Sequence, residues 1–248
     1  MADHPLVNRM TDQIGRWEAE DDRRAIFLAC YALMTGSMFR ALDQRRFVDA
    51  AWVEALVHNF AAYYFDSVER YDSGGSRLEV WRRAHDLSRL PTTTVVQNLL
   101  MGVNAHINCD LVLVLDDMLT PEWPSLDATE RERRRQDYMT VNAIIGETID
   151  TVQDAVVGRY ALAMQAADRV FGPLDEWCTA RLIRNWRDDV WRRAVRLIEA
   201  HEDTERQTWR GETDAIALNR VRLLVEGGEI GARAFGYPLR WLHRLRLM

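Results

Sequence analysis

Apolar residues recur every three to four positions along almost the whole chain, which is the period of an amphipathic α-helix. Stretches that alternate strictly between apolar and polar residues, as in exposed strands, are few. Only 13 Gly and 6 Pro interrupt the pattern. The pattern predicts helices over residues 5–18, 21–42, 48–71, 78–89, 95–118, 127–171, 174–201 and 204–225, with a last helix within 230–248.

The breaks between these segments are short and rich in turn residues. Asp72–Ser76 holds two glycines, Pro121–Pro124 holds two prolines, and Gly172-Pro173 and Gly227-Gly228 are expected to end helices. No segment has the composition of a linker, and no repeat of 30 to 50 residues is visible. We therefore expect an all-α fold, a single-domain helical bundle of about eight helices spanning residues 1–248.

The basic residues limit the chemistry that the protein can use, because all 32 of them are arginine. Without lysine the protein has no Schiff-base or pyridoxal-phosphate lysine and no lysine of a phosphate-binding loop or kinase strand. Any reaction must use histidine, carboxylates, arginine, tyrosine, cysteine, hydroxyl groups or a metal.

The net charge and the cysteine spacing limit the partners and the cellular compartment that we expect for the protein. The net charge of −6 argues against a nucleic-acid binder, which should be basic. Cys30, Cys109 and Cys178 form no CxxC motif, as is usual in a reducing compartment. The N-terminus does not read as a secretory signal, and the longest apolar run, Ala25–Met34, is about half a membrane span. We expect a cytoplasmic protein that binds neither nucleic acid nor membrane.

The most informative stretch is Gly102–Leu111, which places polar residues inside an otherwise apolar helix. His106 and Asp110 are four residues apart and therefore lie on one face, one turn from each other. Asn104 and Asn108 form a second such pair on nearly the opposite face. Polar groups in so apolar a helix are costly unless each has a partner.

Three interpretations fit the His106/Asp110 pair. It is a satisfied hydrogen bond of the core, or Asp110 orients His106 as a general base, or the two side chains ligate one divalent metal. The metal interpretation needs further ligands from other helices. His58, with Glu54 one turn before it, is the best candidate outside the stretch.

The following long helix carries a second set of polar residues at one-turn spacing: Asn142, Gly146 and Asp150. Gly146 would let a helix or a ligand approach closely. If the two long helices are antiparallel neighbours, as their short connection suggests, His106 and Asp150 face one cavity. We take His106, Asp110 and Asp150 as candidate catalytic residues and Asn142 as a substrate-binding candidate.

Three more substrate-binding candidates come from one face of the segment 174–201: Trp177, Arg184 and Trp191. They would form a wall of indole and guanidinium groups for a planar or anionic ligand. The alternative is that the tryptophans pack in the core while Arg184 pairs with Asp188.

The sequence resembles a bacterial, mostly actinobacterial, family of all-helical domains of unknown function. The most specific part is Gly102-Val-Asn-Ala-His-Ile-Asn-Cys-Asp-Leu111, although Cys109 stands where another residue is expected. Phe47–Trp52, Asp137–Asn142 and Ile149–Gln153 are also similar. The resemblance implies the fold class but no activity. A basic set made only of arginine suits a GC-rich genome.

These observations lead to one main hypothesis and two alternatives. The main one is a small-molecule enzyme, of specialised metabolism, that catalyses a cyclisation, isomerisation or hydrolysis in an inter-helix pocket. The first alternative is a non-catalytic helical module that binds a ligand or a protein. The second is a metal-dependent hydrolase that uses His106 and Asp110 as ligands, with a divalent metal as its cofactor. A tail rich in arginine and aromatic residues would suit a homodimer contact.

Overall fold

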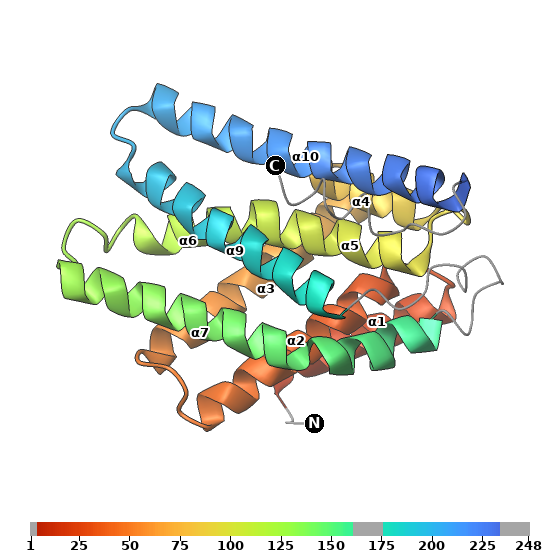
Figure 1. The fold of residues 1–248 in the computed structure, drawn as a ribbon, viewed down its shortest axis with the longest axis horizontal. Coiled ribbons are helices and arrows are strands. Elements are labelled where there is room, and N and C mark those ends of the chain that lie inside the picture. Colours follow the sequence, from red (N-terminus) through yellow and green to blue (C-terminus); the bar gives the residue numbers. More distant parts are fainter. Residues whose placement is uncertain (1–3, 161–175, 234–248) are drawn as a thin grey trace.

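The computed structural model describes residues 4–160 and 176–233, and these form an all-α bundle without strands (Figure 1). Joined segments counted together, the described residues make eight helical rods, which confirms the predicted fold class. The elements are α1 (Pro5–Ala19), α2 (Ala25–Asp43), α3 (Ala50–Asp72), α4 (Glu79–Ser88), α5 (Val95–Ala105), η1 (His106–Asp110), α6 (Leu111–Leu119), α7 (Ala128–Val152), η2 (Gln153–Gly158), α9 (Glu176–Glu199) and α10 (Asp203–Arg233).

The rod α5–η1–α6 is the centre of the bundle, and α2, α3, α4, α9 and α10 all pack against it. Nearly every side chain from Val95 to Leu119 is buried, as expected for a helix that is apolar on all sides. A capping box starts the rod: Thr94 Oγ1 accepts from the Gln97 amide at 3.1 Å, and Gln97 Oε1 accepts from the Thr94 amide at 3.0 Å.

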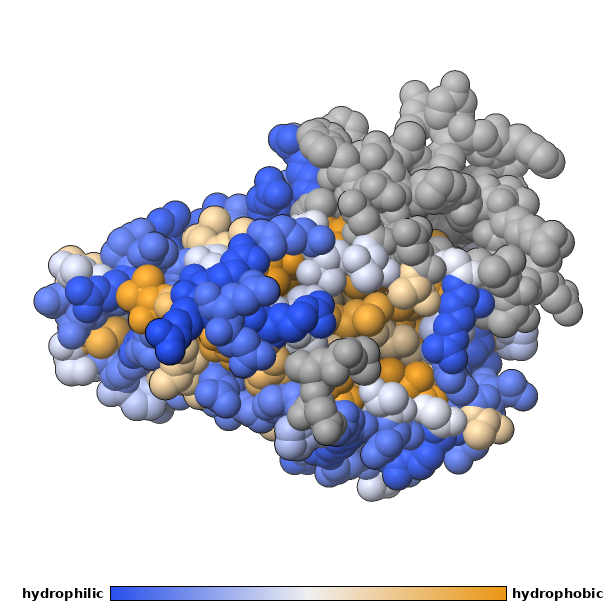
Figure 2. All heavy atoms as spheres, turned by 90° about the horizontal axis from the view of Figure 1, so that it is seen from below, coloured by the Kyte–Doolittle hydropathy of each residue, from blue (hydrophilic) through white to orange (hydrophobic). Residues whose placement is uncertain are grey.

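Among the residues that the structure describes, two helices are long and apolar enough to cross a membrane: Ala25–Asp43 and Val95–Leu119. In this fold 72% of the most apolar 18-residue stretch of Ala25–Asp43 is buried inside the protein, and 94% of that of Val95–Leu119. Both helices form part of the core. Length and composition alone do not distinguish a core helix from a membrane span. On the face seen from below in Figure 2, the coloured surface is mainly hydrophilic, with hydrophobic patches between hydrophilic residues.

Two expectations about the helices are corrected. Helix α7 packs mainly on α2 and α9 and makes little direct contact with α5 or α6, because the apolar rod is already enclosed by other helices. Gly227 and Gly228 do not end α10, which continues to Arg233. Two glycines cost a helix only about 2 kcal/mol together, so flanking packing can outweigh them. The predicted segments 161–171 and 234–248 lie outside the described residues.

The central rod departs from α-helical geometry at His106–Asp110, which forms a turn of π-helix. The Leu111 amide donates to the carbonyl of His106, five residues before it. Such single wide turns inside α-helices are frequent at functional sites. Sequence periodicity predicted a continuous α-helix here, since one inserted residue barely changes the apolar pattern of a helix buried on all sides.

Candidate functional site

His106 and Asp110, at the two ends of the wide turn, are in direct contact, as their spacing predicted. Nδ1 of His106 lies 2.9 Å from Oδ2 of Asp110, and the two residues are 3% and 1% exposed. Trp81 of α4 donates its indole N–H to both carboxylate oxygens, at 3.0 and 2.9 Å. Asp110 is therefore satisfied on both oxygens. The other ring nitrogen of His106, Nε2, is buried and has no hydrogen bond partner among the described residues.

Burial shifts the pKa values of His106 and Asp110 in opposite directions. It lowers the pKa of His106 well below its usual value, and the Arg187 cation lowers it further. It raises the pKa of Asp110 well above its usual value, while the hydrogen bond from Trp81 opposes that shift. At neutral pH the imidazole is therefore uncharged. When Asp110 is ionised and accepts this hydrogen bond, the imidazole proton lies on Nδ1 and Nε2 presents a lone pair.

Aromatic rings fix the plane of the imidazole. The ring stacks on Phe60 with centroids 3.5 Å apart and planes at 6°, and Tyr31 meets it edge-on at 4.4 Å. Phe27 lies edge-on at 5.7 Å. Phe27 can take this place only because residue 102 is glycine: a Cβ there would lie 2.4 to 2.8 Å from three Phe27 atoms. Gly102 thus serves the packing around His106.

His106 lines a cavity of about 100 Å³ between α2, α3, the central rod, α7 and α9. Its walls are almost wholly apolar, formed by side chains such as Phe27, Met38, Val57, Val103, Ile145 and Ile183. Tyr31 and Thr35 also line it. A space of this size holds a few waters or a ligand of several heavy atoms.

Arg187 of α9 is the charged residue among the described residues that line the cavity. It is 2% exposed, its Nε donates to Asn142 Oδ1 of α7, and its guanidinium lies 4.8 Å above the Tyr138 ring. Burial lowers its pKa. No carboxylate among the described side chains forms an ion pair with it. A buried guanidinium that forms no ion pair within the described part of the chain is suited to bind an anionic or carbonyl oxygen.

Sequence reasoning missed Arg187 although a signal was present. The residue continues the buried face of α9, four positions after Ile183 and three before Val190, both of which are buried. An arginine within an apolar helical stripe needs a polar partner inside the protein. Asn142, chosen as a substrate-binding candidate, is that partner and positions the guanidinium without lining the cavity itself.

The asparagines of the central rod have structural roles. Asn104 Nδ2 donates to the carbonyl of Ala217 on α10 at 2.9 Å, and Asn108 Nδ2 donates to Asn104 Oδ1 at 3.1 Å. Asn108 Oδ1 accepts from Arg193 at 3.0 Å and also from Arg220. These bonds tie the rod to α9 and α10 on the side away from the cavity.

Two of the other predicted site residues, Arg184 and Trp191, do not line the cavity. Arg184 is exposed on α9, and its Nη2 lies 3.9 Å from where a Cβ on Gly146 would be. Trp191 is half-buried and packs against Tyr138, with ring centroids 4.9 Å apart. The side chains of Asp150 and Trp177 lie outside the described part of the structure.

His58 does not join His106. Phe60, two residues further along α3, stacks on His106, so His58 points to the opposite side of the helix. There its ring lies 5.5 Å from that of His4. Within the described chain, one group of three metal-ligating side chains lies close together, and it contains neither His106 nor Asp110.

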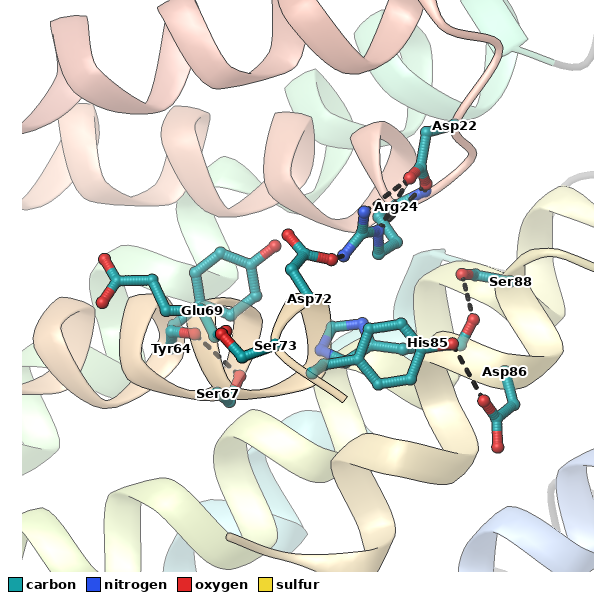
Figure 3. Close-up of polar contacts among 11 residues, drawn as sticks. Asp22, Arg24, Tyr64, Ser67, Glu69, Asp72, Ser73, His85, Asp86 and Ser88 are labelled. Carbon is teal, nitrogen blue, oxygen red and sulfur yellow. Dashed lines mark hydrogen bonds and ion pairs between the residues drawn. The ribbon is translucent and has the colours of Figure 1, made fainter. Parts of the chain in front are cut away.

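A second buried histidine lies in α4, away from the cavity. His85 is next to the ion-pair cluster in which Arg24 contacts Asp22 and Asp72, both at 2.7 Å (Figure 3). Its ring stacks on Trp81 at 5.2 Å, and its Nε2 has no hydrogen bond partner among the described groups. Burial and the Arg24 cation lower the pKa of His85 to about 3. His85 is thus a neutral core residue, without access to the cavity.

Comparison with known proteins identifies a family and supplies no activity. No curated protein matches the chain, and no solved structure matches it either. One family model matches residues 4–227, which include every described residue of the cavity and of the His106/Asp110 pair. The chain belongs to the family of unknown function DUF5995.

Proposed function

We propose that the protein is a small-molecule enzyme that transfers a proton on a small, mostly apolar substrate with a carbonyl or carboxylate group. The observation that carries the proposal is that His106 and Arg187 line the same apolar cavity, with His106 Nε2 left without a hydrogen bond partner among the described residues. The class of reaction is an isomerisation or an elimination. Hydrolysis is less well supported, because an apolar cavity of about 100 Å³ leaves little room for an ordered water beside the substrate.

Arg187 would hold the anionic or carbonyl oxygen of the substrate. In an apolar cavity a guanidinium stabilises negative charge strongly, including charge that develops on an oxygen when a neighbouring C–H bond loses its proton. Asn142 keeps the guanidinium in place through Nε, which leaves the terminal nitrogens for the ligand.

His106 would take the proton at Nε2. In apolar surroundings the charged imidazolium is unfavourable, and the pKa of His106 is lowered for this reason. Because the pKa of Asp110 is raised, its carboxylate can accept the Nδ1 proton of His106 while Nε2 gains a proton from the substrate. The imidazole then stays uncharged throughout, and the pair returns the proton to another carbon of the substrate or to a leaving group.

The proposal is tested without a known substrate by incubating the protein with a bacterial metabolite extract in D₂O. We expect at least one carbonyl or carboxylate metabolite to gain deuterium, detected by mass spectrometry, with the wild type. His106→Gln should abolish this gain while remaining folded by circular dichroism. Arg187→Gln is a second test variant. Its matched control is Arg184→Gln, which removes an exposed arginine of the same helix. No gain of deuterium above a protein-free control would overturn the enzyme proposal.

The second candidate is a non-catalytic binding module, favoured by the tight aromatic enclosure of His106. It also uses the cavity and Arg187. Under it, hexanoate should raise the melting temperature more than hexan-1-ol does, and Arg187→Met should remove that difference, while no deuterium transfer occurs. An actinobacterial source and a cytoplasmic location suit both candidates and rest on the arginine-only composition and the cysteine usage.

A further inference from the structure

Three side chains that ligate metals in many proteins gather on the surface, away from the His106 cavity. They are His4, at the start of α1, and Glu54 and His58, both on α3. One potential ligand atom from each lies within 4.8 Å of the other two. His4 is half-buried, and Glu54 and His58 are exposed, so an ion can reach the group from solvent.

The packing of three helices creates this arrangement. Glu54 and His58 are four residues apart and share one face of α3. His4 is the N-cap residue of α1, and its ring stacks on Phe39 of α2 with centroids 3.4 Å apart and planes at 19°. Phe39 also lies 5.8 Å from the His58 ring. This one phenylalanine therefore holds both imidazoles on the same side.

We propose that His4, Glu54 and His58 form a binding site for one divalent zinc-like cation, with a coordination position left open to water. Two imidazoles and one carboxylate suit zinc, and also nickel and copper, better than they suit calcium or magnesium, which prefer oxygen ligands. Three protein ligands around a tetrahedral ion leave the fourth position for water. The ion would fasten α1 to α3, two helices that are far apart in sequence.

Binding requires small side-chain movements. Ligand atoms around tetrahedral zinc lie about 3.3 Å apart, given bond lengths of about 2.0 Å, so the group must contract slightly from its present spacing. His4 Nδ1 now accepts a hydrogen bond from the Leu6 amide at 3.3 Å. Ligation through Nε2 places a proton on Nδ1, which gives up that bond. The Leu6 amide lies in the first helical turn, where water can replace the lost acceptor.

The experiment uses the full chain with any affinity tag removed and with metals stripped by a chelator. Zinc is titrated calorimetrically into the wild type, and the visible spectrum is recorded with cobalt, whose intense bands report tetrahedral coordination. We expect one ion per chain. His58→Ala and Glu54→Gln should each weaken zinc binding about tenfold or more, while His201→Ala, which removes an exposed histidine elsewhere, should leave it unchanged.

A second readout separates ligation from unfolding. Zinc should raise the melting temperature of the wild type, because it binds the folded state, and should not raise that of His58→Ala. Both variants change exposed side chains and should fold normally by circular dichroism. The proposal is overturned if the wild type takes up no zinc, or if His58→Ala and Glu54→Gln bind it as tightly as the wild type. Arg187→Met should not affect the result, so the test is independent of the proposed function.

Discussion

His85 makes the stability of the protein depend on pH in a way that one substitution can isolate. Its imidazole is buried between Trp81 and the Arg24 ion pairs, and its pKa in the folded state is about 3. In the unfolded chain the pKa returns to the ordinary value of about 6.5. At pH values between these two pKa values, His85 is protonated in the unfolded chain and unprotonated in the folded protein. The stability supplied by neutral His85 is therefore complete above pH 6.5 and is lost as the pH falls towards 3.

The magnitude follows from the two pKa values. Each pH unit inside the window costs up to about 1.4 kcal/mol, so acidification from pH 7 to pH 5 removes about 2 kcal/mol of unfolding free energy through this one residue. The figure hardly changes if the folded pKa is 2 or 4, because both lie below pH 5. Of the charged neighbours, Arg24 has the largest effect and favours the neutral imidazole, Asp22 opposes it, and Arg89 adds a smaller effect in the same direction as Arg24.

The assay compares urea unfolding of the wild type and His85→Phe at pH 7, 6 and 5. Phenylalanine keeps an aromatic ring on Trp81 but cannot take up a proton. Contributions from all other titrating groups are shared by the two proteins and cancel in the difference. We expect the wild type to lose about 2 kcal/mol more than the variant between pH 7 and pH 5.

The reasoning would be refuted by parallel losses in the two proteins over this range. An NMR titration of the His85 ring protons provides an independent check, because a midpoint above pH 5 in the folded protein would contradict the neutral, buried state. His201, which is exposed, serves as the internal reference in the same spectra.

Further predictions concern packing and buried charge. Gly102→Ala should cost about 2 kcal/mol or more by urea unfolding, because the new Cβ would overlap Phe27. Gly146→Ala, whose Cβ would meet nothing closer than 3.9 Å, should be neutral or stabilising by up to about 1 kcal/mol. Asp137→Ala should cost about 2–4 kcal/mol, since its carboxylate accepts two backbone amides before α3, at 2.7 and 2.8 Å. Asp116→Asn should cost about 3 kcal/mol in a thermal melt, because it unpairs two arginines from a buried carboxylate; a loss below 1 kcal/mol would contradict that ion-pair account.

Much of the fold could be predicted from periodicity because the helices are long and their breaks are marked by glycine and proline. The predicted segment 95–118 corresponds to the rod Val95–Leu119, and 48–71 to Ala50–Asp72. Prediction was wrong at Gly227 and Gly228, where a local signal of about 1 kcal/mol per glycine does not stop the helix. It also overlooked the wide turn at His106, since a helix buried on all sides has no polar face to reveal a change of phase.

The sequence by itself determined the helical class, the absence of lysine chemistry and the contact between His106 and Asp110. All three follow from composition or from spacing within one helix, which local geometry controls. Only the tertiary structure decided which cavity His106 faces. The packing of five helical elements brought Arg187, 81 residues further along the chain, to the same cavity. It also turned His58 away from His106 and towards His4, because the direction of a side chain from one helix to another depends on how the helices pack, which no spacing within a single helix encodes.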